Sequence, residues 1–314
     1  MKAWQFVETD EPLVLNEVAE PEPGSGEVVI DVRACGLCHS DITYMTHPGT
    51  KAAMPFTPMT LGHETAGVIS ALGPEVTGWR VGDRVGVCPS GRGPYPGFVA
   101  PGGFAAKQLV VADDLAAVPD DLDISLAAVA TDAGMTSYHA IVVRGGLEEG
   151  TKAGVIGLGG LGQIAARVAV LKGAEVHVAE PKQGVWPLAE SLGVTSVVAD
   201  AAEWAGQDFD LVVDYAGFDT AAHAIEAIRP GGTVVTVGIG AREFTIPSTA
   251  LLRNKNLIGS IGGTVEDIEA LYAMISAGEL SPAYREIGFE EIPTGLELLE
   301  TGQVTGRLVA RFGD

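Results

Sequence analysis

Residues 154–180, "GVIGLGGLGQIAARVAVLKGAEVHVAE", constrain the fold more than any other part of the chain. An apolar run typical of a buried strand leads into Gly157, Gly159 and Gly162, and a helical pattern and a second strand follow. Glycines at this spacing permit a tight turn that brings backbone N–H groups and a helix N-terminus against a pyrophosphate. The second strand ends in Glu180, whose carboxylate can accept hydrogen bonds from both hydroxyls of an adenosine ribose. The segment therefore predicts a βαβ unit that binds a dinucleotide.

The acid that ends the second strand also indicates which dinucleotide binds. A carboxylate at this position repels the 2′-phosphate of NADP(H), so the sequence favours NAD(H). Lys182 weakens this preference a little without supplying the arginine that usually receives a 2′-phosphate. A glycine-rich turn that binds nothing is the alternative, and the flanking strand, helix and acid disfavour it. Three further residues of the turn are expected at the cofactor: Leu158, Gly160 and Leu161.

The pattern of apolar residues indicates two domains, which a length of 314 residues accommodates. From about residue 28 to 111, short β segments alternate with Gly and Pro, as in antiparallel sheets. Residues 125–143 form a helical run, and from Gly154 onward strands alternate with amphipathic helices, which predicts a parallel sheet. The strands of that sheet are expected at residues 154–158, 175–180, 209–217, 232–239 and 256–262.

The C-terminal part contains a helix with well-marked ends. Residues 264–280 have a helical pattern, with Thr264 as the expected N-cap, Asp267 as its capping-box partner and Gly278 near the end. The final segment, residues 304–312, again has the pattern of a strand. We expect this strand to return to the first domain.

Charge and hydropathy limit the possible partners. The chain has 19 Lys and Arg against 41 Asp and Glu, a net charge of −22, which disfavours nucleic acid and anionic membranes. No apolar run approaches the ~18 residues of a membrane span, and the N-terminus shows no apolar signal region. We therefore expect a cytoplasmic protein without a membrane partner, whose ligand is a small molecule.

Three cysteines, Cys35, Cys38 and Cys88, are too few for a disulfide framework or a four-cysteine zinc site. Cys35 and Cys38 lie in "CGLCHSD" and could form a redox pair. Such pairs need a helix N-terminus after a strand, and the surrounding β-rich pattern indicates none. Cys38 also offers a thiolate, and His63 in "LGHETAG" an imidazole, although a lone histidine could equally belong to the core. A catalytic zinc takes three protein ligands, so these two residues do not complete a site.

Five segments, "GLCHSD", "LGHETAGVI", "GWRVGDRV", "GGFAAKQLV" and "GLGGLG", carry a resemblance that spans nearly the whole chain. Through them the sequence resembles the zinc-dependent alcohol dehydrogenases of the medium-chain dehydrogenase/reductase family. The resemblance implies an α/β protein with a GroES-like β-barrel catalytic domain at residues 1–133. It further implies a Rossmann NAD-binding domain, a doubly wound parallel sheet, at residues 134–261, and a return to the catalytic domain at residues 262–314. The implied reaction is the reversible oxidation of an alcohol to an aldehyde or ketone by NAD⁺.

The resemblance also implies one catalytic zinc. In this family the third ligand comes just before the hinge into the nucleotide domain, usually a cysteine and in some secondary-alcohol members an aspartate. The matching stretch "ATDAGMTSYHA" has Asp132 there, so the implied ligands are Cys38, His63 and Asp132, and secondary alcohols and ketones are favoured. Glu64 matches a family carboxylate that can approach the metal and assist ligand exchange. Cys35 is then expected to be a buried small residue in the same turn.

A structural zinc is not expected. Many relatives carry a second zinc in a four-cysteine lobe, whereas here the matching interval, residues 86–103, is a short Pro/Gly loop with Cys88 alone. Two aromatic residues of this loop, Tyr95 and Phe98, could line the substrate. The sequence therefore predicts one zinc ion per chain.

Further site residues follow from the resemblance. Ser40 matches the hydroxyl that hydrogen-bonds the alkoxide and passes its proton to the nicotinamide ribose. The histidine that often continues this relay is replaced by Thr43, so either water or His47 completes it. The implied cofactor contacts are His39 and Arg307 at the pyrophosphate, Thr136 at the nicotinamide, and Val237 and Gly238 at its carboxamide.

Two competing functions are disfavoured by residues of this sequence. A zinc-free quinone or enone reductase of the same fold would not need Cys38, His63 and Asp132 together. A non-catalytic NAD-binding protein would be expected to have lost the ligands or Ser40, whereas this sequence retains them all. Relatives form dimers or tetramers through the edge of the Rossmann sheet, so a homo-oligomer is expected.

Overall fold

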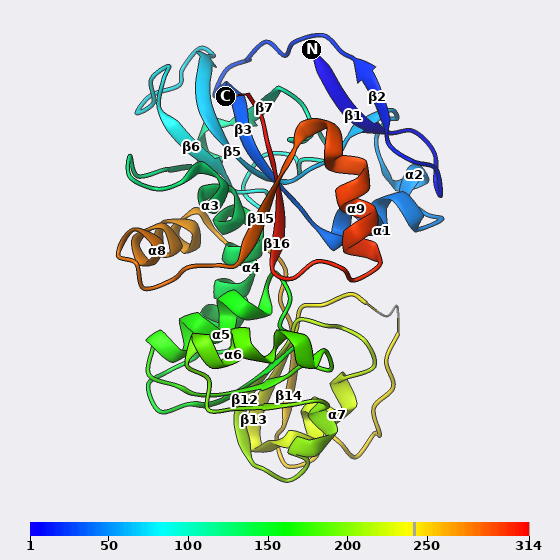
Figure 1. Ribbon diagram of the computed structural model, residues 1–314, viewed down its shortest axis with the longest axis vertical. Coiled ribbons are helices and arrows are strands. Elements are labelled where there is room, and N and C mark those ends of the chain that lie inside the picture. Colours follow the sequence, from blue (N-terminus) through cyan, green and yellow to red (C-terminus); the bar gives the residue numbers. More distant parts are fainter. Residues whose placement is uncertain (241–242, 314) are drawn as a thin grey trace. The chain divides into compact units, whose positions relative to one another are not determined.

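The computed structural model describes residues 1–240 and 243–313, and the chain divides into two compact units (Figure 1). Unit 1 comprises Met1–Met135, Thr264–Gly278 and Tyr284–Asp314. Unit 2 comprises Thr136–Gly263 and Glu279–Ala283. Among the described residues, no helix is long and apolar enough to cross a membrane.

Unit 1 is built around one long strand, β3 (Glu27–Leu37), which pairs antiparallel with three other strands. Its side chains Val28, Ile30 and Val32 enter the main core of the unit, as alternation along a strand requires. The larger sheet has the order β15-β16-β3-β5-β6-β8, with β7 also paired to β3, and a smaller sheet has the order β2-β1-β4. The strand bounds are β1 (Lys2–Phe6), β2 (Val14–Glu17), β4 (Met59–Thr60), β5 (Glu64–Leu72), β6 (Arg84–Val87), β7 (Lys107–Val111), β8 (Leu115–Ala117), β15 (Tyr284–Gly288) and β16 (Arg307–Arg311).

The last strand does return to unit 1, since β16 pairs antiparallel with β3 with Leu308 opposite Leu37. The helices of the unit are α1 (His39–Thr46), α2 (Thr50–Ala53), α3 (Ile124–Val129), α8 (Val265–Ser276) and α9 (Ile292–Glu300). Helix α8 begins as predicted. The Thr264 hydroxyl accepts a hydrogen bond from the Asp267 N–H (3.3 Å), and the Asp267 carboxylate accepts one from the Thr264 N–H (3.0 Å).

The helical run predicted at residues 125–143 is present, but it is not a regular α-helix. Helix α3 begins after Asp123, whose carboxylate accepts hydrogen bonds from the N–H groups of Ser125 (2.8 Å) and Leu126 (3.2 Å). A π-helical turn, Ala130–Gly134, follows directly, and α4 (Met135–Tyr138) and a second π-helical segment (His139–Arg144) complete the run. Apolar periodicity does not distinguish a π turn from an α turn, so the irregularity was not predicted.

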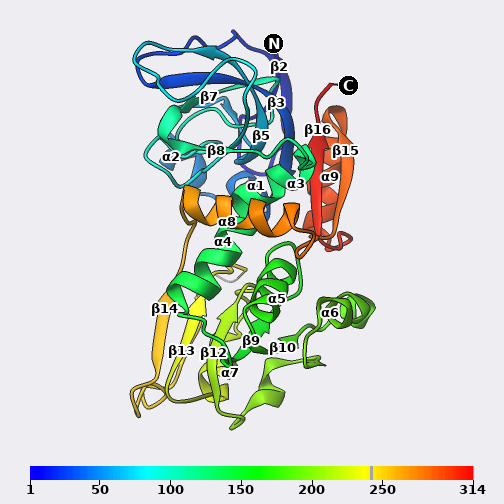
Figure 2. The same ribbon diagram turned by 90° about the vertical axis from the view of Figure 1, so that its left-hand side faces the viewer.

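Unit 2 is a parallel six-stranded sheet with the order β11-β10-β9-β12-β13-β14, and Figure 2 shows β10, β9, β12, β13 and β14 in this succession. In chain order this is 3-2-1-4-5-6, the order of the dinucleotide-binding doubly wound fold. Alternate residues of its central strands face opposite helices. Leu211 and Val213 share a core with α5 and α6, and Val212 shares one with α7. The bounds are β9 (Lys152–Ile156), β10 (Glu175–Ala179), β11 (Ser196–Val198), β12 (Phe209–Asp214), β13 (Ile228–Thr236), β14 (Asn256–Gly259), α5 (Gly162–Leu171), α6 (Trp186–Leu192) and α7 (Ala221–Ala227).

Two details of unit 2 differ from the expectation. Strand β11 was missed, because it has only three residues and none of them is fully buried. Residues 279–283, expected in the catalytic domain, pack with unit 2. The buried amide of Gln163 explains this, since it donates to the Ala283 carbonyl (2.9 Å) and accepts from the Ala283 N–H (2.8 Å).

Gln163→Ala is expected to lower the unfolding free energy by about 1–2 kcal/mol, because it leaves two half-buried backbone groups of Ala283 without their partner. The matched control is Gln207→Ala, which removes an exposed amide bonded to the Glu203 carbonyl and should cost no more than ~0.5 kcal/mol. Urea unfolding followed by tryptophan fluorescence measures both changes. Equal losses in the two variants would contradict this account of the boundary.

Candidate metal centre and nucleotide-binding turn

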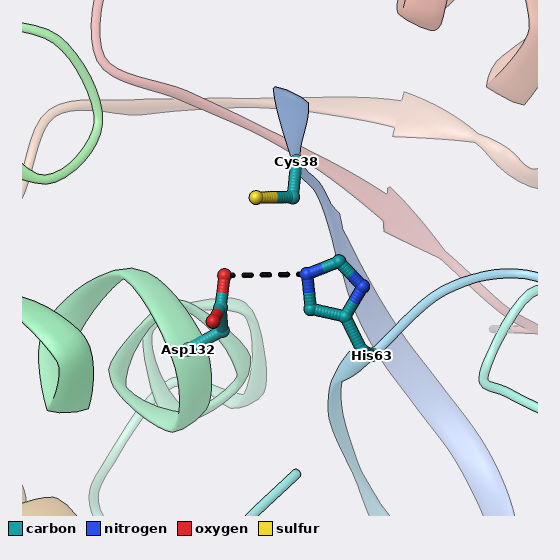
Figure 3. A group of neighbouring side chains, drawn as sticks. All are labelled: Cys38, His63 and Asp132. Atoms are coloured by element: carbon teal, nitrogen blue, oxygen red, sulfur yellow. Dashed lines mark ion pairs between the residues drawn. The ribbon is translucent and has the colours of Figure 1, made fainter. Parts of the chain in front are cut away.

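Three predicted metal ligands of unit 1 meet in one buried cluster. Cys38 follows the last residue of β3, His63 precedes the first residue of β5, and Asp132 lies in the π-helical turn. One ligand atom from each residue lies within 4.8 Å of the others, and Figure 3 shows the three side chains pointing toward one another. The His63 Nε2 atom is 3.5 Å from the Asp132 Oδ2 atom. Residues far apart in the sequence thus supply a thiol, an imidazole and a carboxylate to one point.

The residues of this cluster fit a zinc ion. Sulfur, imidazole nitrogen and carboxylate oxygen are the donors that zinc takes in proteins, and three of them leave a fourth position open. His63 is 1% exposed, and among the described residues its ring nitrogens make no hydrogen bond, although carboxylate oxygens of Asp41 and Asp132 lie 3.3 and 3.5 Å from them. A buried imidazole without a hydrogen bond is costly, and coordination of a metal by one nitrogen would reduce that cost.

Asp41 contacts two of the predicted ligands, and the sequence analysis predicted no role for it. Its buried carboxylate accepts hydrogen bonds from the N–H groups of Cys38 (3.0 Å) and Gly62 (3.2 Å). Its Oδ1 atom also lies 3.3 Å from His63 Nδ1. A carboxylate behind a ligating histidine fixes the orientation of the ring. The signal that could have identified Asp41 is its place three residues after Cys38, where a side chain caps the start of α1.

Arg307 and Glu64 form an ion pair beside the ligands. The Arg307 Nε–H donates to both Glu64 oxygens (3.1 and 3.0 Å), and its Nη2 group donates to Glu64 and to Asp132 Oδ2 (2.9 Å). The Ala133 N–H also donates to Glu64 (3.1 Å). Arg307 was expected at a pyrophosphate, and that contact stays a prediction. Its carboxylate partners were not predicted, because they depend on the pairing of β16 with β3.

Burial and charge set the ionisation of the two carboxyl groups. Burial would raise the pKa of Asp132, but the charges of His63 and Arg307 outweigh it and hold that pKa below its ordinary value. Burial raises the pKa of Glu64 to about 7, although Arg307 opposes the rise. Asp132 is therefore an anion at neutral pH, as a metal ligand requires.

Cys35 does not form a redox pair with Cys38. Both thiols are free, and Cys35 is fully buried on β3 with its sulfur 3.7 Å from the Thr65 hydroxyl. Burial raises the pKa of Cys35 to about 12, which makes it unreactive at neutral pH. One argument from the sequence was nevertheless wrong. A helix, α1, does begin directly after Cys38.

The proposed proton relay follows α1. The Ser40 hydroxyl is 3.7 Å from the Cys38 sulfur. The Thr43 hydroxyl donates to the His39 carbonyl one turn back in the helix (3.1 Å). His47 is exposed at the C-terminus of α1, and its Nδ1 accepts a hydrogen bond from the Gly49 N–H (3.0 Å). Of the three residues predicted for the relay, Ser40 is thus the one whose side chain contacts Cys38, whereas the side chains of Thr43 and His47 bond the backbone of their own helix or turn.

Two tyrosine rings lie near the imidazole of His63. The ring of Tyr95 lies 5.6 Å from that of His63, and the ring of Tyr44 lies 6.4 Å from it. Phe98 packs against Tyr44 with 4.9 Å between ring centroids. The Pro/Gly loop of residues 86–103 therefore brings Tyr95 beside His63, whereas Phe98 contacts Tyr44. That these two aromatic residues line the substrate stays a prediction.

The glycine turn of unit 2 has the form that a pyrophosphate needs. Gly157 has a φ of +85°, and a Cβ atom at Gly162 would lie 1.8 Å from the Gly157 carbonyl oxygen, so neither tolerates a side chain. A Cβ at Gly159 would meet nothing within 4 Å. The turn is thus packed where it meets β9 and α5 and open between them. Glu180, directly after β10, accepts hydrogen bonds from the N–H groups of Leu158 (2.8 Å) and Lys182 (2.9 Å).

The other expected cofactor residues of unit 2 lie at strand or helix ends. The N–H groups of Val237 and Gly238 both donate to the Asp214 carbonyl (2.9 and 3.0 Å), just beyond β13. Thr136 is buried at the start of the unit. Gly160 completes the glycine turn, and the Leu161 carbonyl accepts a hydrogen bond from the Ser137 hydroxyl (2.9 Å).

Known proteins resemble the chain over its whole length. The alcohol dehydrogenase GroES-like domain matches residues 24–120, and the zinc-binding dehydrogenase domain matches residues 160–277. An alcohol dehydrogenase of Geobacillus stearothermophilus is 32% identical over 99% of each chain. The acetophenone reductase of Geotrichum candidum, solved with NAD, superposes with a TM-score of 0.89 at 28% identity, covering 99% of this chain and 97% of its own. The alcohol dehydrogenase of Aeropyrum pernix gives 0.92 at 26% identity, covering 99% and 100%.

Cys38→Ala is expected to lose most of the bound metal, because Cys38 supplies the only thiol of the cluster, whereas Cys35→Ala should keep about one zinc per chain. The two variants remove the same atom from positions three residues apart, so they form a matched pair. Plasma mass spectrometry of protein purified without added metal measures the content. Loss of metal from both variants, or from neither, would contradict the assignment.

Proposed function

The chain belongs to the zinc-type medium-chain alcohol dehydrogenases and interconverts an alcohol with its carbonyl compound, and we propose that it does so with one catalytic zinc ion and NAD(H). The observation that carries the zinc proposal is the buried convergence of Cys38, His63 and Asp132. The open Gly159 and the acid at Glu180 carry the NAD(H) proposal.

The metal site has three protein ligands in this proposal. A zinc ion bound there supplies a Lewis acid that polarises the substrate oxygen. Asp41 keeps the His63 ring in place, and the pair of Glu64 with Arg307 balances charge beside it. The ring of Tyr95 packs beside the imidazole and shields that side of the centre from water. The residues of unit 1 thus hold a pre-formed centre.

In this proposal Ser40 accepts the hydroxyl proton of the substrate while its own hydroxyl proton passes to the next acceptor of the relay. It is half-buried, and its oxygen lies 3.7 Å from the Cys38 sulfur, which places it beside a ligand. Water is favoured over His47 as the next step, because His47 Nδ1 already accepts the Gly49 N–H. Thr43 takes no part in the proposed relay, since its hydroxyl donates to the His39 carbonyl of the same helix.

In this proposal the cofactor is held by the glycine turn, residues 157–162, and by the acid that follows β10. The backbone of Gly157, Leu158, Gly159, Gly160, Leu161 and Gly162 receives the pyrophosphate, and Glu180 receives the adenosine ribose. The main-chain N–H of Lys182 donates a hydrogen bond to the Glu180 carboxylate. Lys182 is therefore not taken as support for NADP(H) in this proposal. The remaining proposed contacts are His39, Thr136, Val237, Gly238 and Arg307.

The substrate is proposed to be a secondary alcohol or its ketone. Asp132 as third ligand supports this through the family resemblance, and the similarity to an enzyme named acetophenone reductase points the same way. We further propose a cytoplasmic homo-oligomer. The free cysteines suit a reducing compartment, which supports the cytoplasm. Strand β14 lies at the edge of its sheet and is followed by Ile261, which is 91% exposed, and this apolar edge supports association.

Asp132→Asn is expected to reduce zinc content sharply and turnover by roughly 100-fold or more, because a neutral amide replaces an anionic ligand. Asp132→Cys, which installs the ligand usual in the family, should keep zinc and measurable turnover. The assay follows NADH at 340 nm with a panel of secondary alcohols and ketones, beside the metal measurement. A wild-type protein that contains no zinc and reduces enones with NADH would instead support the quinone or enone reductase.

Glu180→Gln is expected to raise kcat/KM for NADP(H) by about tenfold, or ~1.4 kcal/mol, because it removes the charge that repels a 2′-phosphate. Glu190→Gln is the control, since Glu190 is an exposed residue of α6. Kinetics with both cofactors measure the ratio. An unchanged ratio in Glu180→Gln would contradict the proposed role.

A further inference from the structure

Arg307 occupies an unusual place for a cation. It is 2% exposed, and among the described residues it is the one buried lysine or arginine, in a chain with 19 of them. The register of β16 on β3 puts Leu308 opposite Leu37, so the residue before Leu308 comes level with Cys38. The strand pairing of the C-terminus thus delivers a positive charge to the metal centre.

The guanidinium joins two carboxylates of that centre. Its Nη2 group donates to Asp132 Oδ2 (2.9 Å) and to Glu64, while Nε donates to both Glu64 oxygens (3.1 and 3.0 Å). The Ala133 N–H fixes Glu64 from the other side (3.1 Å). A planar fork of donors is suited to bridging in this way, whereas an ammonium group is a single point of charge.

Glu64 needs such restraint because it follows the proposed ligand His63 directly, and a carboxylate that approaches the metal to assist ligand exchange must also leave it for substrate to bind. A carboxylate is itself a zinc ligand, and a fourth protein ligand would close the position that a catalytic zinc keeps open for substrate. The backbone makes room for Glu64 at Gly36, where a Cβ atom would lie 1.8 Å from Glu64 Oε1. The Glu64 carboxylate therefore has room beside the metal centre, and hydrogen bonds from Arg307 and Ala133 fix its position there.

We infer that Arg307 is a positioning residue of the metal centre, which holds Glu64 away from the fourth coordination position and steadies the Asp132 ligand. The inference rests on the proposed zinc site. It assigns Arg307 a role within unit 1 that is independent of any contact with a cofactor. The role also suits an aspartate ligand, because Asp132 offers Arg307 an oxygen to bind, which a cysteine does not.

The test uses the full chain loaded with Co²⁺, whose visible spectrum reports its ligands, and imidazole as an added ligand for the open position. The wild type should take up about one Co²⁺ per chain, and imidazole should shift its spectrum. Arg307→Met should retain cobalt but need at least tenfold more imidazole, because Glu64 then occupies the open position. The double variant Arg307→Met, Glu64→Gln should respond as the wild type does.

Two results would overturn the inference: an imidazole response in Arg307→Met equal to that of the wild type, or no recovery on adding Glu64→Gln. If Arg307→Met does not fold or hold cobalt, Arg307→Lys keeps the charge without the fork. It should need several-fold more imidazole, with recovery on adding Glu64→Gln, and a wild-type response would overturn the inference. A wild-type chain that takes up no cobalt would overturn the zinc proposal as well, so the two failures are distinguishable.

Discussion

The antiparallel pairing of β3 with β5 and β16 is the constraint on which the candidate metal centre depends. The register sets Gly36 opposite Glu64 and Leu37 opposite Leu308, so the ends of three strands meet at one level. Cys38, His63 and Arg307 each lie next to one of these paired residues. A slip of one residue would turn the side chains of a strand to the opposite face and disperse the site. The sheet therefore fixes the chemistry as well as the core.

Charge at the centre is balanced locally in a strongly acidic chain. With a net charge of −22, the surface repels anions, and the cation that matters most to the site lies under it. Arg307 pairs with Glu64 and Asp132, while Asp41 faces His63 from behind. Buried ion pairs contribute little net stability, but removal of one partner is costly. The arrangement is best understood as serving the geometry of the ligands.

The sequence predicted local features well and non-local ones poorly. The glycine turn at Gly157 and the cap at Thr264 depend on a few neighbouring residues, and both are found. Asp132 was predicted as a metal ligand through resemblance alone, since nothing in its own segment marks it. The partners of Arg307 were missed because they arise from strand pairing across 243 residues. Asp41 has a local capping position, but its bond to Gly62, 21 residues away, gave no signal in its own segment. Patterns in one segment carry no information on such distant register.

The π-helical turn at Ala130–Gly134 has a consequence of its own. The Met135 N–H reaches back five residues to the Ala130 carbonyl, so this turn holds one residue more than an α-helical turn would. Deleting one residue here would let the helix become regular, and the segments before and after the turn would keep nearly the same relative orientation, because the extra residue is taken up within the turn. The residues of the turn itself, Asp132 among them, would shift. The site is thus specified by the number of residues in the turn as well as by their identity. A chain with all three ligands present and one residue fewer would no longer aim Asp132 at the other two.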